Sequence, residues 1–185
     1  SLLRDRQCYK GKFYGVQSHN CMHMSPVVDQ CNLACTYCWR EPHMDTLELT
    51  DQDPMDLLYE SVRAQRRLLS GFGGNPKVPR EKWLDAQNPK HVAISLNGEP
   101  TLYTRLAEYM DLCHKHGMTT MLVTNGTLPK VLEKLDTLMR NSSDAAGITK
   151  IKSSVTRSDR SGDRTKTYTV AEWDKLPETE RRAGE

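Results

Sequence analysis

The stretch CNLACTYC, residues 31–38, places three cysteines on one short loop. Cys31, Cys35 and Cys38 are spaced C-x3-C-x2-C, and Tyr37 stands directly before the last of them. Three thiolates held this close together can bind three irons of a [4Fe–4S] cube, whose protein ligands are cysteine thiolates. The fourth iron then stays open to a small molecule. The stretch therefore predicts a redox enzyme with an iron–sulfur cluster rather than a structural domain.

Zinc and disulfide bonds are the rival explanations of these cysteines. A structural zinc site needs a second cysteine pair beside Cys35 and Cys38, which Cys8, Cys21 or a histidine would have to supply. Disulfides are typical of small exported proteins, whereas this chain has 185 residues and its first residues form no apolar export signal. Five cysteines crowd into residues 8–38. In a cytoplasmic protein, which we expect here, such crowding more often indicates metal binding or catalysis.

The overall composition is that of a single polar domain. The net charge is +2, and 37% of the residues are hydrophobic. So weak a positive charge neither requires nor excludes a nucleic-acid partner. No apolar run approaches the ~20 residues of a membrane helix, so we expect no membrane partner.

Strands and helices alternate along the chain after its cysteine-rich start. The pattern predicts strands at 26–28, 91–96 and 118–123, and helices at 53–70, from 102 to about 116, and from Pro129 onward. Residues 75–89, rich in proline and asparagine, read as a polar loop. Strand–helix units in series predict a parallel α/β sheet. The apolar helix faces expected to cover it are Met55, Leu58, Tyr59, Val62 and Leu69; Leu102, Leu106, Tyr109, Met110 and Cys113; and Val131, Leu132, Leu135 and Leu138.

Three polar features follow the three expected strands. They are the cysteine loop, the segment 97–99 (Asn-Gly-Glu) and the segment 124–126 (Thr-Asn-Gly). Ligands of parallel α/β sheets bind at the carboxyl ends of the strands. The topology therefore predicts that these features converge at one edge. Taken singly, each of the last two segments is also an ordinary turn after a strand.

The chain changes character at about residue 140. Apolar residues become sparse, and the stretch SVTRSDRSGDRTKT, residues 154–167, is polar with little periodicity. We expect a loose or disordered tail there, with a weak strand at 148–155.

The cysteine spacing resembles that of the radical S-adenosylmethionine (SAM) superfamily. In that superfamily SAM binds the open iron and is cleaved to a 5′-deoxyadenosyl radical, while the protein orients the reacting groups. The resemblance implies an α/β fold, a partial radical-SAM (β/α) barrel with an N-terminal cysteine-rich segment and a polar C-terminal tail. It also implies that SAM is held by Tyr37 beside the adenine, by Asn97, Gly98 and Glu99 at the amino group, and by Thr124 and Asn125 at the carboxylate or ribose.

Four stretches narrow the resemblance: CYKGKFYGVQSHNCMHMSP (8–26), CNLACTYCWREP (31–42), HVAISLNGEPTLY (91–103) and LVTNGTLP (122–129). Together they resemble the tRNA 4-demethylwyosine synthase family of wybutosine biosynthesis, in its shorter archaeal form, over roughly residues 1–140. The resemblance implies a lyase that condenses pyruvate-derived carbons with N1-methylguanosine in phenylalanine tRNA to form a tricyclic base. An electron donor such as flavodoxin or ferredoxin and a monomeric enzyme are further expectations.

The same resemblance assigns roles to the N-terminal segment. Cys8 and Cys21 match two ligands of a second [4Fe–4S] cluster, whose third cysteine would lie before Ser1. Lys10 matches the lysine that forms a Schiff base with pyruvate, and Lys12, two residues away, is the alternative.

The expected organisation is therefore a second-cluster segment (1–30), a partial barrel (26–139) and a tail outside the family (140–185). Two other functions stay open at this point. One is another radical-SAM enzyme, such as a glycyl-radical activase, which would not need Cys8, Lys10 and Cys21. The other is a non-catalytic zinc-binding RNA module.

Overall fold

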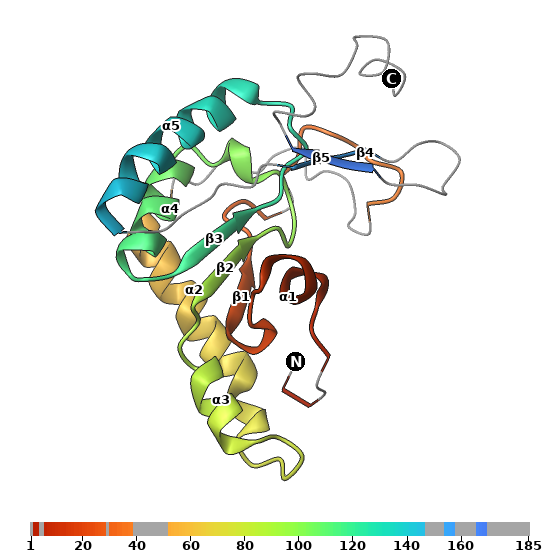
Figure 1. Cartoon of the computed structure of the whole chain (residues 1–185), viewed down its shortest axis with the longest axis vertical. Coiled ribbons are helices and arrows are strands. Elements are labelled where there is room, and N and C mark those ends of the chain that lie inside the picture. The colour runs from red at the N-terminus through yellow and green to blue at the C-terminus, as the bar shows by residue number, and fades with distance from the viewer. Residues whose placement is uncertain are drawn as a thin grey trace. The chain divides into compact units, whose positions relative to one another are not determined.

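A three-stranded parallel sheet forms the centre of the fold. The computed structural model describes residues 2–3, 6–28, 30–38, 52–146, 154–157 and 166–169. It divides into two compact units, Ser1–Ser142 and Ser143–Glu185. In the first unit, β1 (Cys21–Met24), β2 (His91–Ile94) and β3 (Thr119–Leu122) lie side by side in the order β1-β2-β3 (Figure 1). All pairs are parallel, so the predicted parallel α/β sheet is confirmed.

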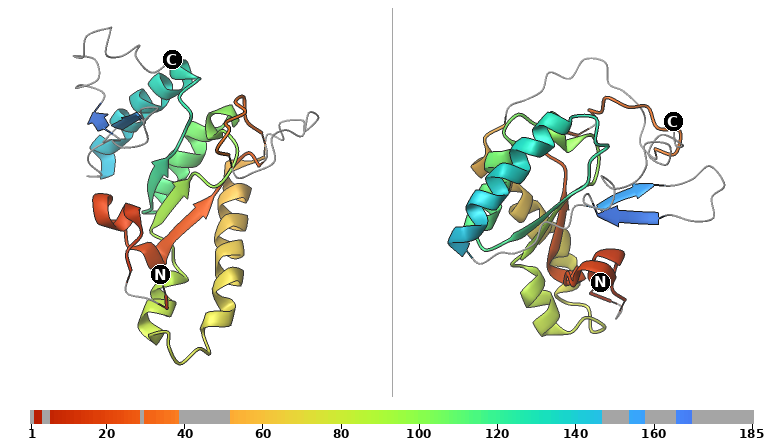
Figure 2. Two further views of the ribbon diagram at one scale, coloured as in Figure 1. Left: turned by 90° about the vertical axis from the view of Figure 1, so that its right-hand side faces the viewer. Right: turned by 45° about the horizontal axis from the view of Figure 1, so that its top comes forward.

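Helices cover this sheet unequally. The helices are α1 (Tyr9–Tyr14), α2 (Pro54–Leu69), α3 (Arg80–Ala86), α4 (Leu106–Lys115) and α5 (Pro129–Ala146), with short 3-10 turns η1 (Ser18–Asn20), η2 (Ser70–Phe72) and η3 (Pro100–Leu102). Figure 2 shows α2 on one side of the sheet and α1 on the other. The two faces of the sheet therefore have different surroundings.

The main core lies between the sheet and α2 and α4. Side chains alternate along a strand, so Met22 and Met24 of β1 face these helices, whereas Cys21 and His23 face the other way. The buried members of this core are Met22, Met24, Val27, Leu57, Leu58, Val92, Ile94, Tyr103, Leu106, Tyr109, Met110, Cys113 and Leu135. The opposite face is thus left to polar residues of β1 and to α1.

Helix α2 begins as the sequence predicts. The Asp53 side chain accepts hydrogen bonds from the backbone N–H groups of Met55 (2.8 Å) and Asp56 (3.4 Å), and Pro54 takes the first helical position. The predicted apolar face was partly wrong. Met55 and Tyr59 are exposed, and Leu57 is buried together with Leu58.

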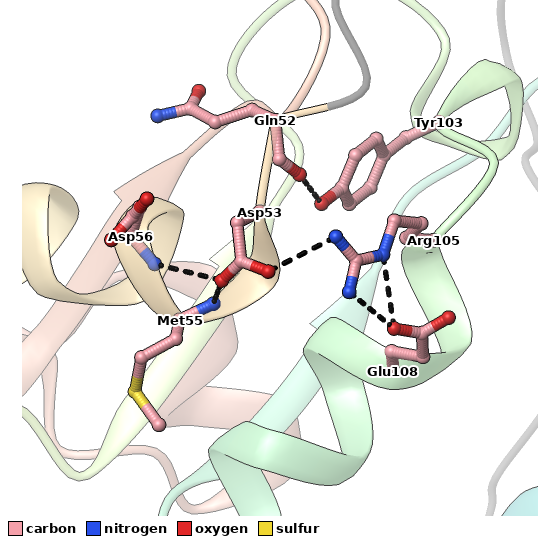
Figure 3. Close-up of polar contacts among 7 residues, drawn as sticks. All are labelled: Gln52, Asp53, Met55, Asp56, Tyr103, Arg105 and Glu108. Carbon is pink, nitrogen blue, oxygen red and sulfur yellow. Dashed lines mark hydrogen bonds and ion pairs between the residues drawn. The ribbon is translucent and has the colours of Figure 1, made fainter.

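A polar cluster joins the start of α2 to the start of α4 (Figure 3). Arg105 Nη1 lies 3.1 Å from Asp53 Oδ2, and Arg105 Nη2 lies 2.8 Å from Glu108 Oε2. The Tyr103 hydroxyl donates to the carbonyl of Gln52 at 2.5 Å. The start of α2 is therefore held to the segment that follows β2.

Two predicted elements differ from the structure. The first strand is Cys21–Met24 rather than 26–28, because Pro26 has no N–H to donate to a sheet and the chain bends there. The expected loop 75–89 contains α3, whose Trp83 donates from Nε1 to the carbonyl of Leu69 at 2.9 Å. Trp83 and the buried Ala86 belong to a small second core, so tertiary packing stabilises a helix where the local composition favoured a loop.

The remaining predicted elements agree with the structure except at their ends. Strands β2 and β3 lie within the predicted ranges, and α5 starts at Pro129. Leu102 belongs to η3, since α4 starts only at Leu106, and Leu138 of α5 is exposed.

The C-terminal part contains more regular structure than the sequence predicts. Helix α5 runs to Ala146, beyond the expected boundary at residue 140. In the second unit, β4 (Ser154–Arg157) pairs antiparallel with β5 (Lys166–Thr169). β4 includes residues 154 and 155 of the weak strand expected at 148–155, whereas β5 lies where a loose or disordered tail was expected. Of the weak strand expected at 148–155, residues 148–153 lie outside the described residues. Within the described part of the chain, no helix is long and apolar enough to cross a membrane.

Candidate functional site

The turn after β2 packs directly against the segment that leads into the cysteine loop. Gly98 has φ 67°, and a Cβ placed on it would lie 2.2 Å from the carbonyl oxygen of Val27. Asn97 donates its backbone N–H to Ser25 Oγ at 2.6 Å, and Glu99 donates its own to the carbonyl of Gln30 at 2.7 Å. Glycine is required at position 98 both for the left-handed backbone and for this close approach.

Glu99 is a buried carboxylate, and the groups among the described residues that donate to it are neutral. Its side chain is 2% exposed. Oε1 accepts from the Thr101 N–H (3.1 Å) and from the hydroxyls of Thr101 and Thr124 (both 2.5 Å), and Oε2 accepts from the Asn125 N–H (2.7 Å). No lysine, arginine or histidine among the described residues pairs with it. Buried charges are normally paired, and Oε2 keeps acceptor capacity, so the carboxylate suits a ligand ammonium.

The turn after β3 also reaches the cysteine loop. The Asn125 side chain lies 3.8 Å from Cys31 Sγ and 2.8 Å from Asn32 Oδ1, measured from Nδ2. The same residue contacts Glu99 through its backbone. The predicted convergence of the cysteine loop with segments 97–99 and 124–126 is therefore confirmed.

The loop cysteines are available for metal binding. None of the six cysteines of the chain forms a disulfide. Cys31 and Cys35 are half-buried and Cys38 is exposed, and the Cys38 N–H donates to the carbonyl of Cys35 at 3.0 Å. Tyr37 is 88% exposed, and its hydrogen bond to Cys35 raises the pKa of its hydroxyl. Three free thiols on one partly open loop fit the donor set of a [4Fe–4S] cluster.

A single metal ion fits these residues less well. Among the residues that the structure describes, no three histidine, cysteine, aspartate or glutamate side chains are close enough to bind one ion together. In a cube each thiolate binds its own iron, so the three sulfurs lie farther apart than the ligands of a single ion do. The zinc alternative therefore gains no support from the geometry.

The N-terminal residues singled out by the sequence lie together. Desolvation raises the pKa of the Cys8 thiol, but hydrogen bonds from Ser18 and from the backbone of Gly11 and Lys10 outweigh it and leave this pKa lowered. Desolvation raises the pKa of Cys21, on which both Cys8 and Lys10 act electrostatically. Cys8, Lys10 and Cys21 thus form one cluster of side chains.

Lys10 is buried and has no anionic partner among the residues that the structure describes. It is 7% exposed, whereas Lys12 is exposed. Its ammonium lies 5.5 Å from the ring centroid of Tyr9, and no described residue forms a hydrogen bond or ion pair with it. Burial and the positive charge of Lys10 lower the pKa of His23, whose Nε2 lies 2.6 Å from Ser95 Oγ.

Several contacts in this region were not predicted. Asn32 and Thr127 connect the cysteine loop to the turn after β3. Asp85 of α3 accepts from His19 (2.7 Å) and from the buried Asn20 (2.8 Å), directly before β1. These residues carry no local motif, so only their neighbours in space reveal them. Cys113, by contrast, is the buried core thiol that its place on an apolar helix face predicts.

The chain belongs to the radical SAM superfamily, because the model of the Radical SAM superfamily matches residues 25–173. This class comprises enzymes that use SAM and a [4Fe–4S] cluster, which agrees with the predicted cofactors and with the cysteine loop. The match also extends beyond residue 140, where we expected the family likeness to end.

Known relatives narrow the class further. The chain is 47% identical, over 140 residues, to the S-adenosyl-L-methionine-dependent tRNA 4-demethylwyosine synthase of Pyrococcus abyssi, and the alignment covers 73% of this chain and 40% of that protein. A solved structure of TYW1 with a lysine-pyruvate adduct bound has 40% sequence identity and a TM-score of 0.66, covering 72% of this chain and 44% of that one. A crystal structure of archaeal TYW1 gives 36% identity and a TM-score of 0.61, covering 72% and 45%. The chain spans less than half the length of these relatives.

Family membership distinguishes between the broad alternatives. Because the chain belongs to a superfamily of radical SAM enzymes, an enzyme is favoured over a non-catalytic zinc-binding RNA module. These relatives carry the name tRNA 4-demethylwyosine synthase rather than that of a glycyl-radical activase.

Proposed function

We propose that this chain carries the cluster-binding and pyruvate-binding part of a tRNA 4-demethylwyosine synthase. Pyruvate-derived carbons are condensed with N1-methylguanosine in phenylalanine tRNA, and the product is the tricyclic 4-demethylwyosine base. The identity to named synthases supports the reaction class. The observation that carries the proposal is the buried Lys10, which lies beside Cys8 and Cys21 without an anionic partner among the described residues.

Lys10 is the proposed nucleophile. Its amine attacks the C2 carbonyl of pyruvate, water leaves, and an imine joins the lysine to the three-carbon unit. No carboxylate among the described residues holds Lys10 in an ion pair, so its Nζ is not engaged by another side chain. A related structure contains a lysine–pyruvate adduct, which supports the same chemistry here.

The SAM site is proposed at the carboxyl ends of the strands. Cys31, Cys35 and Cys38 would hold the cluster, and when bound, the cluster and SAM supply one-electron chemistry. Glu99 would accept the SAM ammonium through Oε2. The remaining proposed SAM contacts are Tyr37, Asn97, Gly98 and Thr124, together with the backbone of Asn125.

Further partners follow from the same proposal. Cys8 and Cys21 would bind a second [4Fe–4S] cluster together with a further thiolate.

The tRNA contributes a base that has to leave the anticodon stack to reach Lys10. A flavodoxin or ferredoxin would supply electrons, and the enzyme would act as a cytoplasmic monomer. Segments 1–30 and 26–139 would correspond to the second-cluster segment and the partial barrel.

Trapping of the imine tests the role of Lys10. The chain is incubated with isotope-labelled pyruvate, reduced with borohydride, and digested for peptide mass spectrometry. We expect the label on Lys10, no label in Lys10→Ala, and normal labelling in Lys12→Ala, which changes the exposed neighbour. Label on Lys12, or equal labelling of many surface lysines, would contradict the proposal.

Product analysis tests the reaction itself. The anaerobically reconstituted chain is supplied with SAM, dithionite, pyruvate and phenylalanine tRNA that carries N1-methylguanosine. Formation of the tricyclic nucleoside, detected by mass spectrometry and dependent on pyruvate, supports the synthase. If SAM is cleaved but no tricyclic nucleoside forms although both pyruvate and the tRNA are present, another radical-SAM enzyme would be favoured.

A further inference from the structure

A closed ring of hydrogen bonds joins the turn after β3 to the cysteine loop. Asn125 Nδ2 donates to Asn32 Oδ1 at 2.8 Å, and Asn32 Nδ2 donates to Thr127 Oγ1 at 2.6 Å. The Thr127 hydroxyl completes the ring by donating to Asn125 Oδ1 at 2.7 Å. Each group donates to the next in the same direction, an arrangement in which hydrogen bonds strengthen one another.

The orientation of the Asn125 amide within this ring is determined by the backbone. The Thr127 N–H lies 3.0 Å from Asn125 Oδ1, and a backbone N–H can only donate, so this atom is the oxygen. Nδ2 is therefore the atom that lies 3.8 Å from Cys31 Sγ. An amide offers two donors and two acceptor positions. Asn32 and Cys31 take the donors and Thr127 takes both acceptor positions, which leaves the side chain no capacity for SAM.

We propose that Asn125 is a positioning residue for the cluster: it orients Cys31 through Asn32 and donates a hydrogen bond to the Cys31 sulfur. This role replaces the SAM contact that the sequence suggested for its side chain. It rests on the family's cluster and not on the pyruvate or tRNA chemistry.

The proposed hydrogen bond has a consequence for electron transfer. If Cys31, Cys35 and Cys38 held a cluster, its one-electron reduction by an external donor would place part of the added negative charge on the ligand sulfurs. An N–H group that points at such a sulfur stabilises the reduced state, and hydrogen bonds to sulfur are among the factors that set cluster potentials. Loss of the Asn125 amide should therefore lower the reduction potential and make the cluster harder to reduce.

A redox titration without SAM, followed by electron paramagnetic resonance on the anaerobically reconstituted chain, tests the proposal. We expect a lower potential in Asn125→Leu than in the wild type. Asn75→Leu is the matched control, because Asn75 Oδ1 also accepts a backbone N–H two residues on, from Lys77 at 2.9 Å, but contacts no cysteine. An unchanged potential in Asn125→Leu, combined with weaker SAM binding, would overturn the proposal and make Asn125 a SAM ligand.

Thr127 provides a second and milder test. Thr127→Val removes the hydroxyl that closes the ring but keeps the Asn125 side chain, and Thr127→Ser keeps the hydroxyl. We expect Thr127→Val to lower the potential and Thr127→Ser to resemble the wild type. If Asn125→Leu takes up no iron while Asn75→Leu does, the Thr127 pair decides the matter. Equal potentials for Thr127→Val, Thr127→Ser and the wild type would then contradict the proposed role.

Discussion

Gly98→Ala is expected to destabilise the fold much more than Gly117→Ala, although the two glycines share nearly the same backbone. φ is 67° at Gly98 and 72° at Gly117. A Cβ on Gly117 would meet nothing within 4 Å, whereas a Cβ on Gly98 would lie 2.2 Å from Val27 O and 2.8 Å from Gln30 O. The pair therefore separates the effect of the backbone conformation from that of the close approach.

The expected magnitudes follow from these two effects. A left-handed conformation costs an L-residue about 1–2 kcal/mol, and this is the whole loss expected at Gly117. At Gly98 the neighbouring atoms are backbone carbonyls, so no side-chain rotation can relieve the contact. Overpacking of this kind adds about 1–3 kcal/mol. Gly98→Ala should thus lose about 2–5 kcal/mol, a large share of the ~5–15 kcal/mol that stabilises a typical domain.

Urea unfolding of the apo chain, followed by far-ultraviolet circular dichroism, measures both free energies of unfolding. We expect the Gly98→Ala midpoint to lie well below that of Gly117→Ala, with similar slopes. The reasoning is refuted if the two variants lose the same free energy, because the carbonyls of Val27 and Gln30 would then not pack against Gly98.

Three further outcomes are expected. Glu99→Gln should weaken SAM binding about tenfold or more in equilibrium dialysis, since hydrogen bonds to charged groups contribute about 1.5–3 kcal/mol, while the exposed Glu108→Gln should bind normally. The hydrogen bond from the Met55 N–H and then the contacts with Arg105 lower the pKa of Asp53, and they outweigh desolvation, which raises it. The ionised carboxylate therefore stabilises the fold at pH values above the ordinary pKa of aspartate. In unfolding titrations, the difference in free energy of unfolding between the wild type and Asp53→Asn should shrink as the pH falls through the lowered pKa. A difference that stays constant with pH would contradict this role of Asp53. Burial raises the pKa of Cys113 to about 11, so at pH 8 iodoacetamide should label Cys38 but not Cys113 in the folded apo chain, as peptide mass spectrometry can show.

Local patterns were sufficient for part of the fold. The apolar segments of β2 and β3 and the capped start of α2 at Asp53 follow from neighbouring residues, so the sequence predicted them. β1 was misplaced because Met22 and Met24 alternate with Cys21 and His23, residue types that are typical of metal binding as well as of one face of a strand. α3 was missed because Trp83 and Ala86 pack against residues elsewhere in the chain.

Some features of the candidate site likewise follow from local sequence, and others only from the folded structure. The sequence by itself determined which thiols share the loop at 31–38 and that segments 97–99 and 124–126 follow strands of one parallel sheet, because spacing and strand order are local properties. Tertiary structure alone decided that Lys10 is buried while Lys12 is exposed, and that the side-chain amide of Asn125 lies 3.8 Å from Cys31 Sγ. Burial and hydrogen-bond capacity depend on partners that are distant in sequence, so these two distinctions arise only when the chain has folded.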